Sequence, residues 1–475
     1  MNDVLTKLKD DFKGIEDVIF KEQIINNHMI NFVYSEIMVS SVNLNKFVLQ
    51  NNAYLIDEKK TIDDIYNFFY NVLPAHSVKK IDKYQDAVFG ILNGFVIFIY
   101  NNECLQIEVR ASIDRGVNDA KSEIAIRGSK DSFNENFNTN MGLVKRRLRT
   151  TNLKYKSCFL GTETKTRTAV LYMDNIANKE LVDDVYRKLN MINIDGILDS
   201  GYIKNIITHD TLLFPTVMTT ERPDLVSMAL LEGKIAIIMD NSPYALILPT
   251  FFVDFFHTPD DYYQKNVNVS FIRIIRLIAF FISIFLPAYY IAITTHNHDS
   301  VSLNMLLNFI TQRSSVPFPA LVEALLMSIS FEILRESDMR ASSTIGSAVS
   351  ILGGLILGDA LVSAGIISPI MIIVVAISAI SGLVFTSVEL SSCIRFFRFL
   401  LMFLGTFLGI YGIILGLIYL LIKLASINSF GYPYTTPFGP IIFSELRDSF
   451  IKKEGDKYRK RNSILTKNII RGRDL

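Results

Sequence analysis

The order of charged and apolar positions divides the chain into two parts. Up to about residue 270, charged side chains recur every few positions, as they do in water-soluble domains. From Ala341 to Lys423, by contrast, only five residues are charged. A helix that crosses a bilayer needs about 20 apolar residues. Four uncharged runs approach or exceed this length, namely 277–295, 341–358, 360–388 and 399–422. The pattern therefore predicts a multi-domain chain with an all-α membrane domain over 271–425.

A further apolar segment, 316–338, differs from the four runs because it contains prolines and charges. These residues are Pro317, Pro319, Glu323, Glu332 and Arg335. The mixture predicts an amphipathic helix that is re-entrant, interfacial or buried among other helices, which leaves four crossings. Six crossings are the alternative, with one long run folded into a hairpin at Ser368-Pro369.

Both ends of this multi-pass protein are predicted to be cytoplasmic. The first residues are polar and lack the apolar core of a signal peptide. Arg273 and Arg276 precede the first crossing, in agreement with the excess of basic residues in cytoplasmic segments. Two cytoplasmic ends require an even number of crossings, although four crossings place Arg395 and Arg398 outside. The tail, 426–475, adds further basic residues at Lys452, Lys453, Lys457, Arg459, Lys460 and Arg461.

The first half contains two similar stretches. A strand-like segment with Tyr34 is followed by a helical pattern, and the same order occurs around Tyr172, 138 residues later. Segments around Gly94 and Gly233 also match, 139 residues apart, and each glycine closes a helical pattern and opens a strand. Similar separations predict two copies of an α/β (α+β) subdomain, over 1–130 and 158–270. Chance similarity between β-rich segments is the competing explanation.

A basic connector, 131–157, is predicted to join the two subdomains. Lys145, Arg146, Arg147 and Arg149 cluster there in a helical pattern. Such a cluster is a solvated or salt-bridged helix face, or alternatively a contact between subunits.

Composition and motifs argue against several classes of protein. The 48 basic and 47 acidic residues leave a net charge of +1, whereas nucleic-acid binders carry a basic excess. The three cysteines show no CxxC spacing, and the chain contains neither a GxxxxGK[ST] phosphate loop nor a GxSxG elbow. His296, His298 and Asp299 form the densest metal-like cluster, without a helical i, i+4 pair. We therefore expect no enzymatic activity, cofactor, metal ion or nucleic-acid partner.

Small residues form two stripes in the membrane domain. Gly405, Gly409, Gly412 and Gly416 would share one face of a straight helix, which favours close helix packing within one subunit or between subunits. A second stripe is a candidate lining for an ion pore, although helix packing explains its spacing equally well. The residues of this second stripe are Ser343, Ser347, Ser350 and Gly354.

Charged residues and a proline among the apolar runs require compensation. Pro287 predicts a kink that is tolerated where a neighbouring helix covers the carbonyl that the proline frees. Glu332 has a possible partner in Arg335 at i+3, whereas Glu323 lies on the opposite face and needs another helix or a water-filled cavity. Together with Pro317 and Pro319, these residues are candidates for gating or coupling.

Over 127–389, an ordered series of motifs resembles the A subunits of GerA-type spore germination receptors. The motifs lie in both halves of the chain. They include Asp199-Ser200-Gly201-Tyr202, Thr220-Glu221-Arg222-Pro223-Asp224, Pro259-Asp260-Asp261-Tyr262-Tyr263, Val316-Pro317-Phe318-Pro319, Phe331-Glu332-Ile333-Leu334-Arg335-Glu336 and Ile345-Gly346-Ser347-Ala348-Val349-Ser350.

The resemblance implies a function that the spacing of residues does not. A subunit of this family is expected in the inner spore membrane, with a transporter-like B subunit and a lipoprotein C subunit as partners. It is expected to form a homo-oligomer with a central ion path that opens in response to a nutrient and starts germination. Two alternatives remain: a non-conducting scaffold of the receptor, and an ion-release amplifier of the same family without a direct nutrient response.

Overall fold

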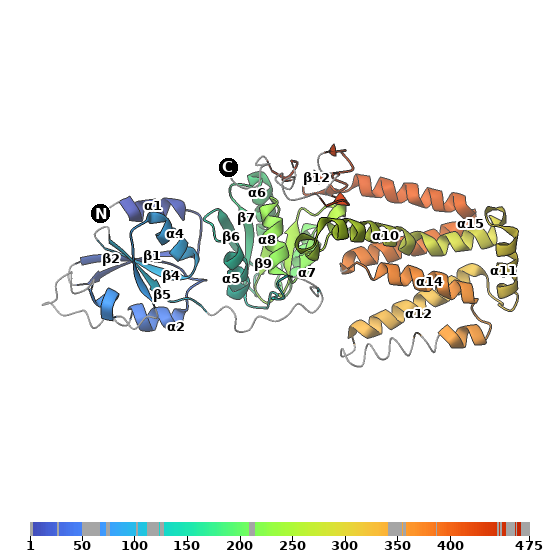
Figure 1. Ribbon diagram of the computed structural model, residues 1–475, viewed down its shortest axis with the longest axis horizontal. Helices are drawn as coiled ribbons and strands as arrows, with labels where there is room; N and C mark the ends of the chain where they lie inside the picture. Colours follow the sequence, from blue (N-terminus) through green and yellow to red (C-terminus); the bar gives the residue numbers. More distant parts are fainter. Residues whose placement is uncertain are drawn as a thin grey trace. The chain divides into compact units, whose positions relative to one another are not determined.

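The computed structural model describes most of the chain as two compact units. The described residues are 3–25, 28–49, 67–72, 77–100, 103–111, 123, 128–208, 214–340, 354, 358–385, 387–443, 446, 449–452, 461 and 463–466. The α/β unit comprises Met1–Asp210, Val217–Pro249 and Gly455–Leu475, and the helical unit comprises Thr211–Thr216 and Thr250–Glu454. Each unit is shown in Figure 1.

The first repeat of the α/β unit is an antiparallel five-stranded sheet with helices on both faces. Its strands pair in the order β1-β2-β4-β5-β3. The elements, in chain order, are α1 (Asp3–Asp11), β1 (Val18–Ile25), β2 (His28–Ser35), α2 (Ser41–Asn43), η1 (Leu44–Leu49), η3 (Phe68–Val72), β3 (Val78–Ile81), α4 (Tyr84–Leu92), β4 (Phe95–Tyr100) and β5 (Glu103–Glu108).

The second repeat has the same strand order, β6-β7-β9-β10-β8, and again every pairing is antiparallel. This shared topology confirms the predicted pair of similar α/β (α+β) subdomains. The elements are α5 (Phe137–Arg147), β6 (Leu153–Leu160), β7 (Thr166–Met173), α6 (Lys179–Asn190), α7 (Ser200–Ile207), β8 (Met218–Thr220), α8 (Pro223–Leu231), β9 (Ile235–Met239) and β10 (Ala245–Leu248).

The boundary between the repeats differs from the prediction. The expected connector, 131–157, contains α5 and the start of β6. Because α5 precedes β6 as α1 precedes β1, these residues are the first elements of the second repeat rather than a linker. Helices α1 and α5 share no sequence landmark, so the alternation of strands and glycines could not reveal their equivalence.

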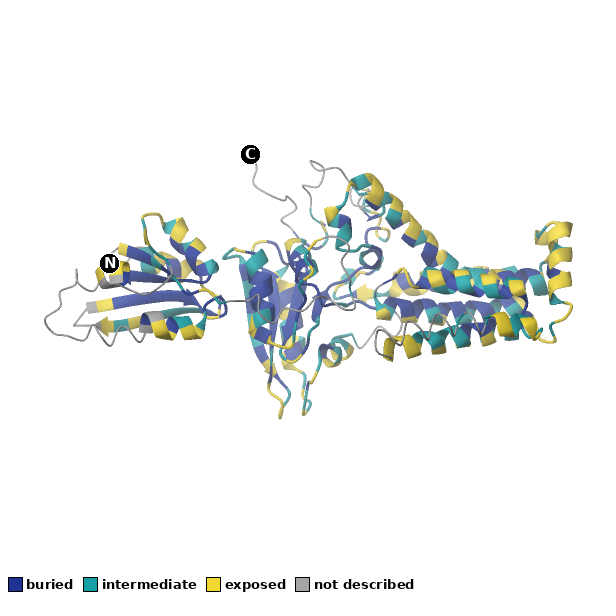
Figure 2. Ribbon diagram, turned by 60° about the horizontal axis from the view of Figure 1, so that its bottom comes forward, coloured by how far each residue is buried: buried dark blue, intermediate teal, exposed yellow. Residues whose placement is uncertain are grey.

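Both sheets are buried on their two faces. In the first repeat, Phe32, Phe69 and Phe98 pack together on one side, with ring centroids 4.7–5.8 Å apart, and Leu8 and Ile91 lie in the cluster on the other. Strands β4 and β9 are buried at every position, and their backbones are dark blue in Figure 2. Burial on both sides explains why these strands are continuous apolar runs without alternation.

In the helical unit, helices α10, α12, α14 and α15 lie alongside one another (Figure 1). Among the described residues, α10 and α15 are long and apolar enough to cross a membrane, and α14 is a shorter apolar helix. The elements are η4 (Phe252–Phe256), α9 (Asp260–Tyr263), α10 (Asn266–Thr295), η5 (His298–Ser300), α11 (Leu303–Arg313), α12 (Ala320–Arg340), α14 (Pro369–Gly382), α15 (Val388–Ser426), β11 (Asn428–Ser429) and β12 (Tyr432–Pro433).

Two of the predicted crossings are not single straight helices. The run 360–388 is interrupted before α14, which begins at Pro369 with Ser368 as its N-cap, because proline is favoured in a first helical turn and disrupts an interior one. The run 399–422 is interrupted inside α15 at Gly409, whose φ of 59° and ψ of −142° are not helical.

At Gly409, α15 folds back on itself as a helical hairpin. The rings of Phe397 and Tyr419 lie 6.3 Å apart, centroid to centroid, although 22 residues of straight helix would separate them by about 33 Å. A Cβ atom at Gly412 would lie 2.2 Å from the Leu404 carbonyl oxygen. The left-handed φ that glycine accepts makes this reversal possible.

The hairpin of α15 is testable by cross-linking. In a chain whose three native cysteines are replaced by alanine, the double substitution Phe397→Cys and Tyr419→Cys is expected to form an intramolecular disulfide on mild oxidation. Phe397→Cys with Tyr411→Cys is the matched control. Tyr411 is 74% exposed, and it follows the turn at Gly409 by two residues, whereas Phe397 precedes that turn by about three helical turns. A gel-shift assay that found no cross-link for the first pair would contradict the hairpin.

Candidate functional site

The carbonyl group of Ser283 joins three helices of the helical unit. Pro287 has no backbone N–H, so the carbonyl four residues earlier loses its helical partner. Arg398 Nε on α15 donates to this oxygen at 3.0 Å, and Ser378 Oγ on α14 donates to it at 2.8 Å. All three side chains are buried. The predicted compensation of Pro287 by a neighbouring helix is therefore confirmed, and two helices provide it.

Glu323 is a fully buried acid that is held between α12 and the start of α14. Its Oε1 accepts from Arg313 Nε at 3.2 Å, and its Oε2 accepts from the backbone N–H and the hydroxyl of Ser368 at 2.9 and 2.8 Å. Because Ser368 is the N-cap of α14, the carboxylate also lies at the positive end of that helix. The separate partner that Glu323 requires is thus another helix.

Glu332 forms its ion pair with a different residue from the one expected. Arg395 Nη1 on α15 lies 2.8 Å from Glu332 Oε2, whereas the sequence suggested Arg335. Arg335 follows one turn later on α12 and is half-buried. The i+3 spacing permits a local pair, but the packing of α12 near α15 provides an interhelical partner instead. Arg395 thus contacts α12, as Arg398 contacts α10.

The remaining residues singled out from the sequence lie in different places. Pro317 and Pro319 form the exposed approach to α12. Ser343, Ser347 and Ser350 lie outside the described residues, and of that stripe only Gly354 is described.

The loop after α10 caps the turn of the α15 hairpin. His296 Nε2 lies 2.6 Å from the Thr406 carbonyl oxygen, and Asn297 Oδ1 accepts from Ile410 N–H at 3.0 Å. Among the described residues, no group of three or more possible ligands surrounds a metal position.

The four glycines of α15 do not form one continuous face. Gly405 lies against α10, where a Cβ atom would be 2.9 Å from the Ala288 carbonyl oxygen. Gly412 and Gly416 lie between the two arms of the hairpin, and Gly409 is its turn. The expected single stripe assumed a straight helix, and the break at Gly409 separates it into two contacts.

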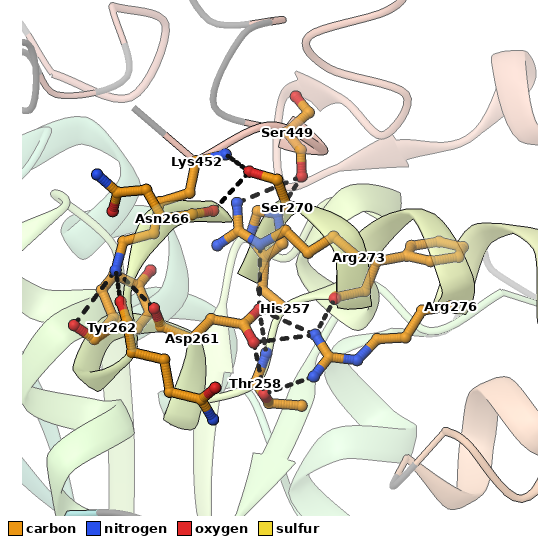
Figure 3. Close-up of polar contacts among 12 residues, drawn as sticks. His257, Thr258, Asp261, Tyr262, Asn266, Ser270, Arg273, Arg276, Ser449 and Lys452 are labelled. Carbon is orange, nitrogen blue, oxygen red and sulfur yellow. Dashed lines mark hydrogen bonds and ion pairs between the residues drawn. The ribbon is translucent and has the colours of Figure 1, made fainter. Parts of the chain in front are cut away.

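A buried cluster of charges surrounds the first turns of α10, as Figure 3 shows. Asp261 accepts from Arg273 Nε at 3.0 Å and from Arg276 Nη1 at 2.9 and 3.1 Å. Burial alone would raise the pKa of Asp261, but Arg276 and Arg273 hold it below its ordinary value. The two arginines that suggested a cytoplasmic flank therefore neutralise an acid of the same unit.

The end of the chain contributes a third segment to this cluster (Figure 3). Lys452 Nζ donates to the carbonyl oxygens of Asp261 and Gln264 at 2.7 and 3.0 Å. His257 Nε2 lies 2.6 Å from the Ser449 carbonyl oxygen. Burial, and then the charge of Arg273, lower the pKa of His257 to about 4, so the neutral ring donates to that carbonyl at pH 7. We call His257, Asp261, Arg273, Arg276, Ser449 and Lys452 the α10 junction.

Lys145, Arg146 and Arg147 of α5 form ion pairs within the α/β unit. Lys145 forms a buried ion pair with Asp17, which precedes β1 in the first repeat. Arg146 and Arg147 both pair with Asp131, at 3.1 Å for Arg146. Of the two interpretations of this cluster, a salt-bridged helix face fits these contacts.

Breaking the α10 junction is expected to destabilise the protein. Asp261→Asn leaves two buried guanidinium groups without their carboxylate, and such a loss costs about 3 kcal/mol. Asp299→Asn, an exposed change in the same unit, is the control. Denaturant unfolding of the purified protein measures the difference. Because the pKa of Asp261 is lowered in the folded state, its contribution is present in full above about pH 4, the ordinary range of an aspartate, and is lost as the pH falls from there through the lower folded pKa. Equal stabilities of the two variants would contradict this assignment.

Comparison with known proteins places this geometry in a family. The chain matches the family model described as "Bacillus/Clostridium GerA spore germination protein" over residues 6–464. Spore germination protein KA of Bacillus subtilis (strain 168) is 37% identical over 392 residues, which cover 82% of this chain and 72% of that protein.

Two further relatives match over a greater length. "Uncharacterized membrane protein YfkQ" of B. subtilis (strain 168) is 35% identical over 93% of this chain and 86% of its own length. Spore germination protein GerQA of Bacillus cereus is 33% identical over 93% of this chain and 88% of its own length.

One solved structure is also similar to part of the chain. It is the N-terminal domain of the A subunit of the Bacillus megaterium spore germinant receptor GerK3, at 29% identity, a TM-score of 0.39, and coverage of 52% of this chain and 94% of that chain. The match to the family model spans nearly the whole sequence, and the chain belongs to the GerA family of spore germination proteins.

Proposed function

We propose that the helical unit, together with copies of itself, forms an ion channel of the inner spore membrane that opens in response to a nutrient. As an A subunit of a GerA-family germination receptor, the chain is a membrane-associated receptor component and not an enzyme. A transporter-like B subunit and a lipoprotein C subunit are the proposed partners. The observation that carries the channel proposal is the set of buried or half-buried polar contacts that join α12 to α11, α14 and α15.

Helices α12 and α14 start at the same end of the helical unit and run in the same direction. Glu323, in the first turn of α12, contacts Ser368 at the start of α14. Further along, Glu332 contacts α15 at Arg395, close to Arg398, which contacts Ser283 together with Ser378 of α14. Ser343, Ser347, Ser350 and Gly354, which we propose as pore lining, lie between α12 and α14 in the sequence.

We propose six crossings rather than the four that we expected. Five are α10, α12, α14 and the two arms of α15, and the sixth is the apolar run 341–358 that the sequence predicts to cross. Lys452, after the last helix, contacts Asp261, before the first one. Both ends of the helical unit are thus adjacent, as an even number requires, and we propose that both are cytoplasmic.

The proposed gating mechanism is a shift between two states of the polar contacts that join α12 to its neighbours. Glu323 forms an ion pair with Arg313 of α11 and accepts hydrogen bonds from Ser368 at the start of α14. Glu332 forms an ion pair with Arg395 of α15. A nutrient bound on the partner subunit would stabilise an arrangement in which these contacts differ, and only such differential stabilisation shifts the population. We propose that Pro317, Pro319, Glu323, Glu332 and Arg335 act in this coupling.

The lining role predicts a block by a larger side chain. Ser347→Leu is expected to abolish nutrient-triggered ion release while leaving the amount of protein and its assembly unchanged, because leucine would narrow and dehydrate the path. Potassium release from spores, with immunoblots of the membrane, measures both. Ser337→Leu, at an exposed position of α12, is the control. Normal release from Ser347→Leu spores with normal protein levels would exclude this residue from the pore.

The coupling role predicts a loss of the closed state. Glu323→Gln keeps much of the shape but removes the charge that faces Arg313, so nutrient-independent ion release is expected to rise roughly 5-fold or more, the scale of a coupling free energy of at least 1 kcal/mol. Glu336→Gln, whose side chain is exposed and pairs with Arg340, is the matched control. An unchanged basal rate for Glu323→Gln would remove this residue from the gate.

A flux measurement distinguishes the channel from the alternatives. Ion flux through liposomes that contain the purified chain and its partners is expected only for a channel, whereas a non-conducting scaffold gives none. Flux that depends on ion concentration but not on any nutrient would instead identify an amplifier.

A further inference from the structure

The two repeats of the α/β unit differ in what covers one shared position. Met38 and Ile176 are equivalent, because each follows the second strand of its repeat and they are 138 residues apart. In the first repeat, the Met38 carbonyl oxygen accepts from Ala111 N–H at 2.9 Å. Ala111 lies just after β5, so the first repeat covers this carbonyl with the continuation of its own strand.

The second repeat cannot use the same solution. Strand β10, the equivalent of β5, ends at Leu248, and the residues from Thr250 onward belong to the helical unit. The chain therefore leaves the repeat before it reaches the position that Ala111 takes in the first copy. Another segment is required to cover the carbonyl of Ile176, since a buried carbonyl without a donor is costly.

The end of the chain supplies that segment. Thr466 Oγ1 donates to the Ile176 carbonyl oxygen, and Arg461 Nε donates to the Leu231 carbonyl oxygen at 2.8 Å. Leu465 and Thr466 are only 2% and 4% exposed. These contacts all lie within the α/β unit.

Gly233 makes room for the end of the chain. A Cβ atom at this position would lie 3.3 Å from Thr466 Cβ. Its equivalent in the first repeat, Gly94, lies against the backbone of Met38, where a Cβ atom would be 2.4 Å from the carbonyl oxygen. The two glycines thus stand at corresponding places, but in the second repeat the neighbour is the C-terminal segment.

We propose that Arg461 and residues 463–466 are the missing last element of the second repeat, supplied by a segment that follows the helical unit in the sequence. The docking site fits a short segment with one aliphatic side chain and one hydroxyl donor, as in Leu465 and Thr466. In this role the segment completes the second repeat, whether or not the helical unit conducts ions.

The docked segment predicts that disturbing the docking site also exposes the groups that the segment covers. In the full-length protein, Leu465→Asp places a charge in the buried docking site and is expected to raise hydrogen exchange over 463–466 at least about tenfold. It is also expected to raise hydrogen exchange over 174–177, because Thr466 would no longer cover the carbonyl of Ile176. Thr466→Val, which removes only the hydroxyl donor, should give a smaller change in the same direction.

Two outcomes of this experiment would overturn the proposal. Unchanged exchange over 463–466 in both variants would show that the docking site does not hold the tail. Faster exchange over 463–466 with unchanged exchange over 174–177 would show that the segment does not complete the repeat. Leu198→Asp, at a leucine of the same unit that is 64% exposed, is the matched control and should leave both measurements as in the unsubstituted protein. Neither readout depends on ion conduction, so the proposed channel function can fail while the docked segment holds.

Discussion

The backbone carbonyl of Ser283 is the contact on which the arrangement of the helical unit depends. Pro287 breaks one hydrogen bond of α10, and a carbonyl in an apolar surrounding must find another donor. Arg398 and Ser378 meet that need from two different helices. One missing N–H thus sets the relative heights of α10, α14 and the first arm of α15. Gly382 allows α14 to approach, because a Cβ there would lie 3.2 Å from Ser283 Oγ.

The same principle applies to these buried and half-buried charges of the unit, which form ion pairs with one another. Glu323 lies at the N-terminus of α14 beside Arg313, Glu332 faces Arg395, and Asp261 is enclosed by two arginines. A charge in a low-dielectric environment persists when it is paired and hydrogen-bonded. As long as these ion pairs are formed, they stabilise one arrangement of the helices. Rearranging them requires compensating contacts, which is the property that a two-state gate needs.

Duplication explains an asymmetry in the α/β unit. The two repeats share a strand order. Only in the first does the chain continue past the strand β5 to Ala111, which covers the carbonyl of Met38. The second repeat passes the chain to the helical unit and recovers its missing contact from the C-terminus at Thr466. Most of the helical unit, Thr250–Glu454, lies in the sequence between β10 and the segment that contains Thr466. The last element of the second repeat therefore follows the helical unit along the chain. It also gives the α/β unit a covalent connection to each end of the helical unit.

The sequence by itself determined the division into a charged half and an apolar half, the duplication, and the need for a partner at Pro287, because each of these is a local pattern or a repeated spacing. It did not determine which groups meet. Glu332 has Arg335 one turn away, yet pairs with Arg395, 63 residues later, because α12 packs near α15. Four glycines at helical spacing suggested one face, but Gly409 reverses the chain and divides them. In the sequence, Arg273 and Arg276 suggest the basic flank of a membrane crossing, but in the structure both bind the carboxylate of Asp261. In each case a pattern fixes the direction of a side chain relative to its own helix, whereas its partner depends on how distant segments pack, and only the tertiary structure decides that.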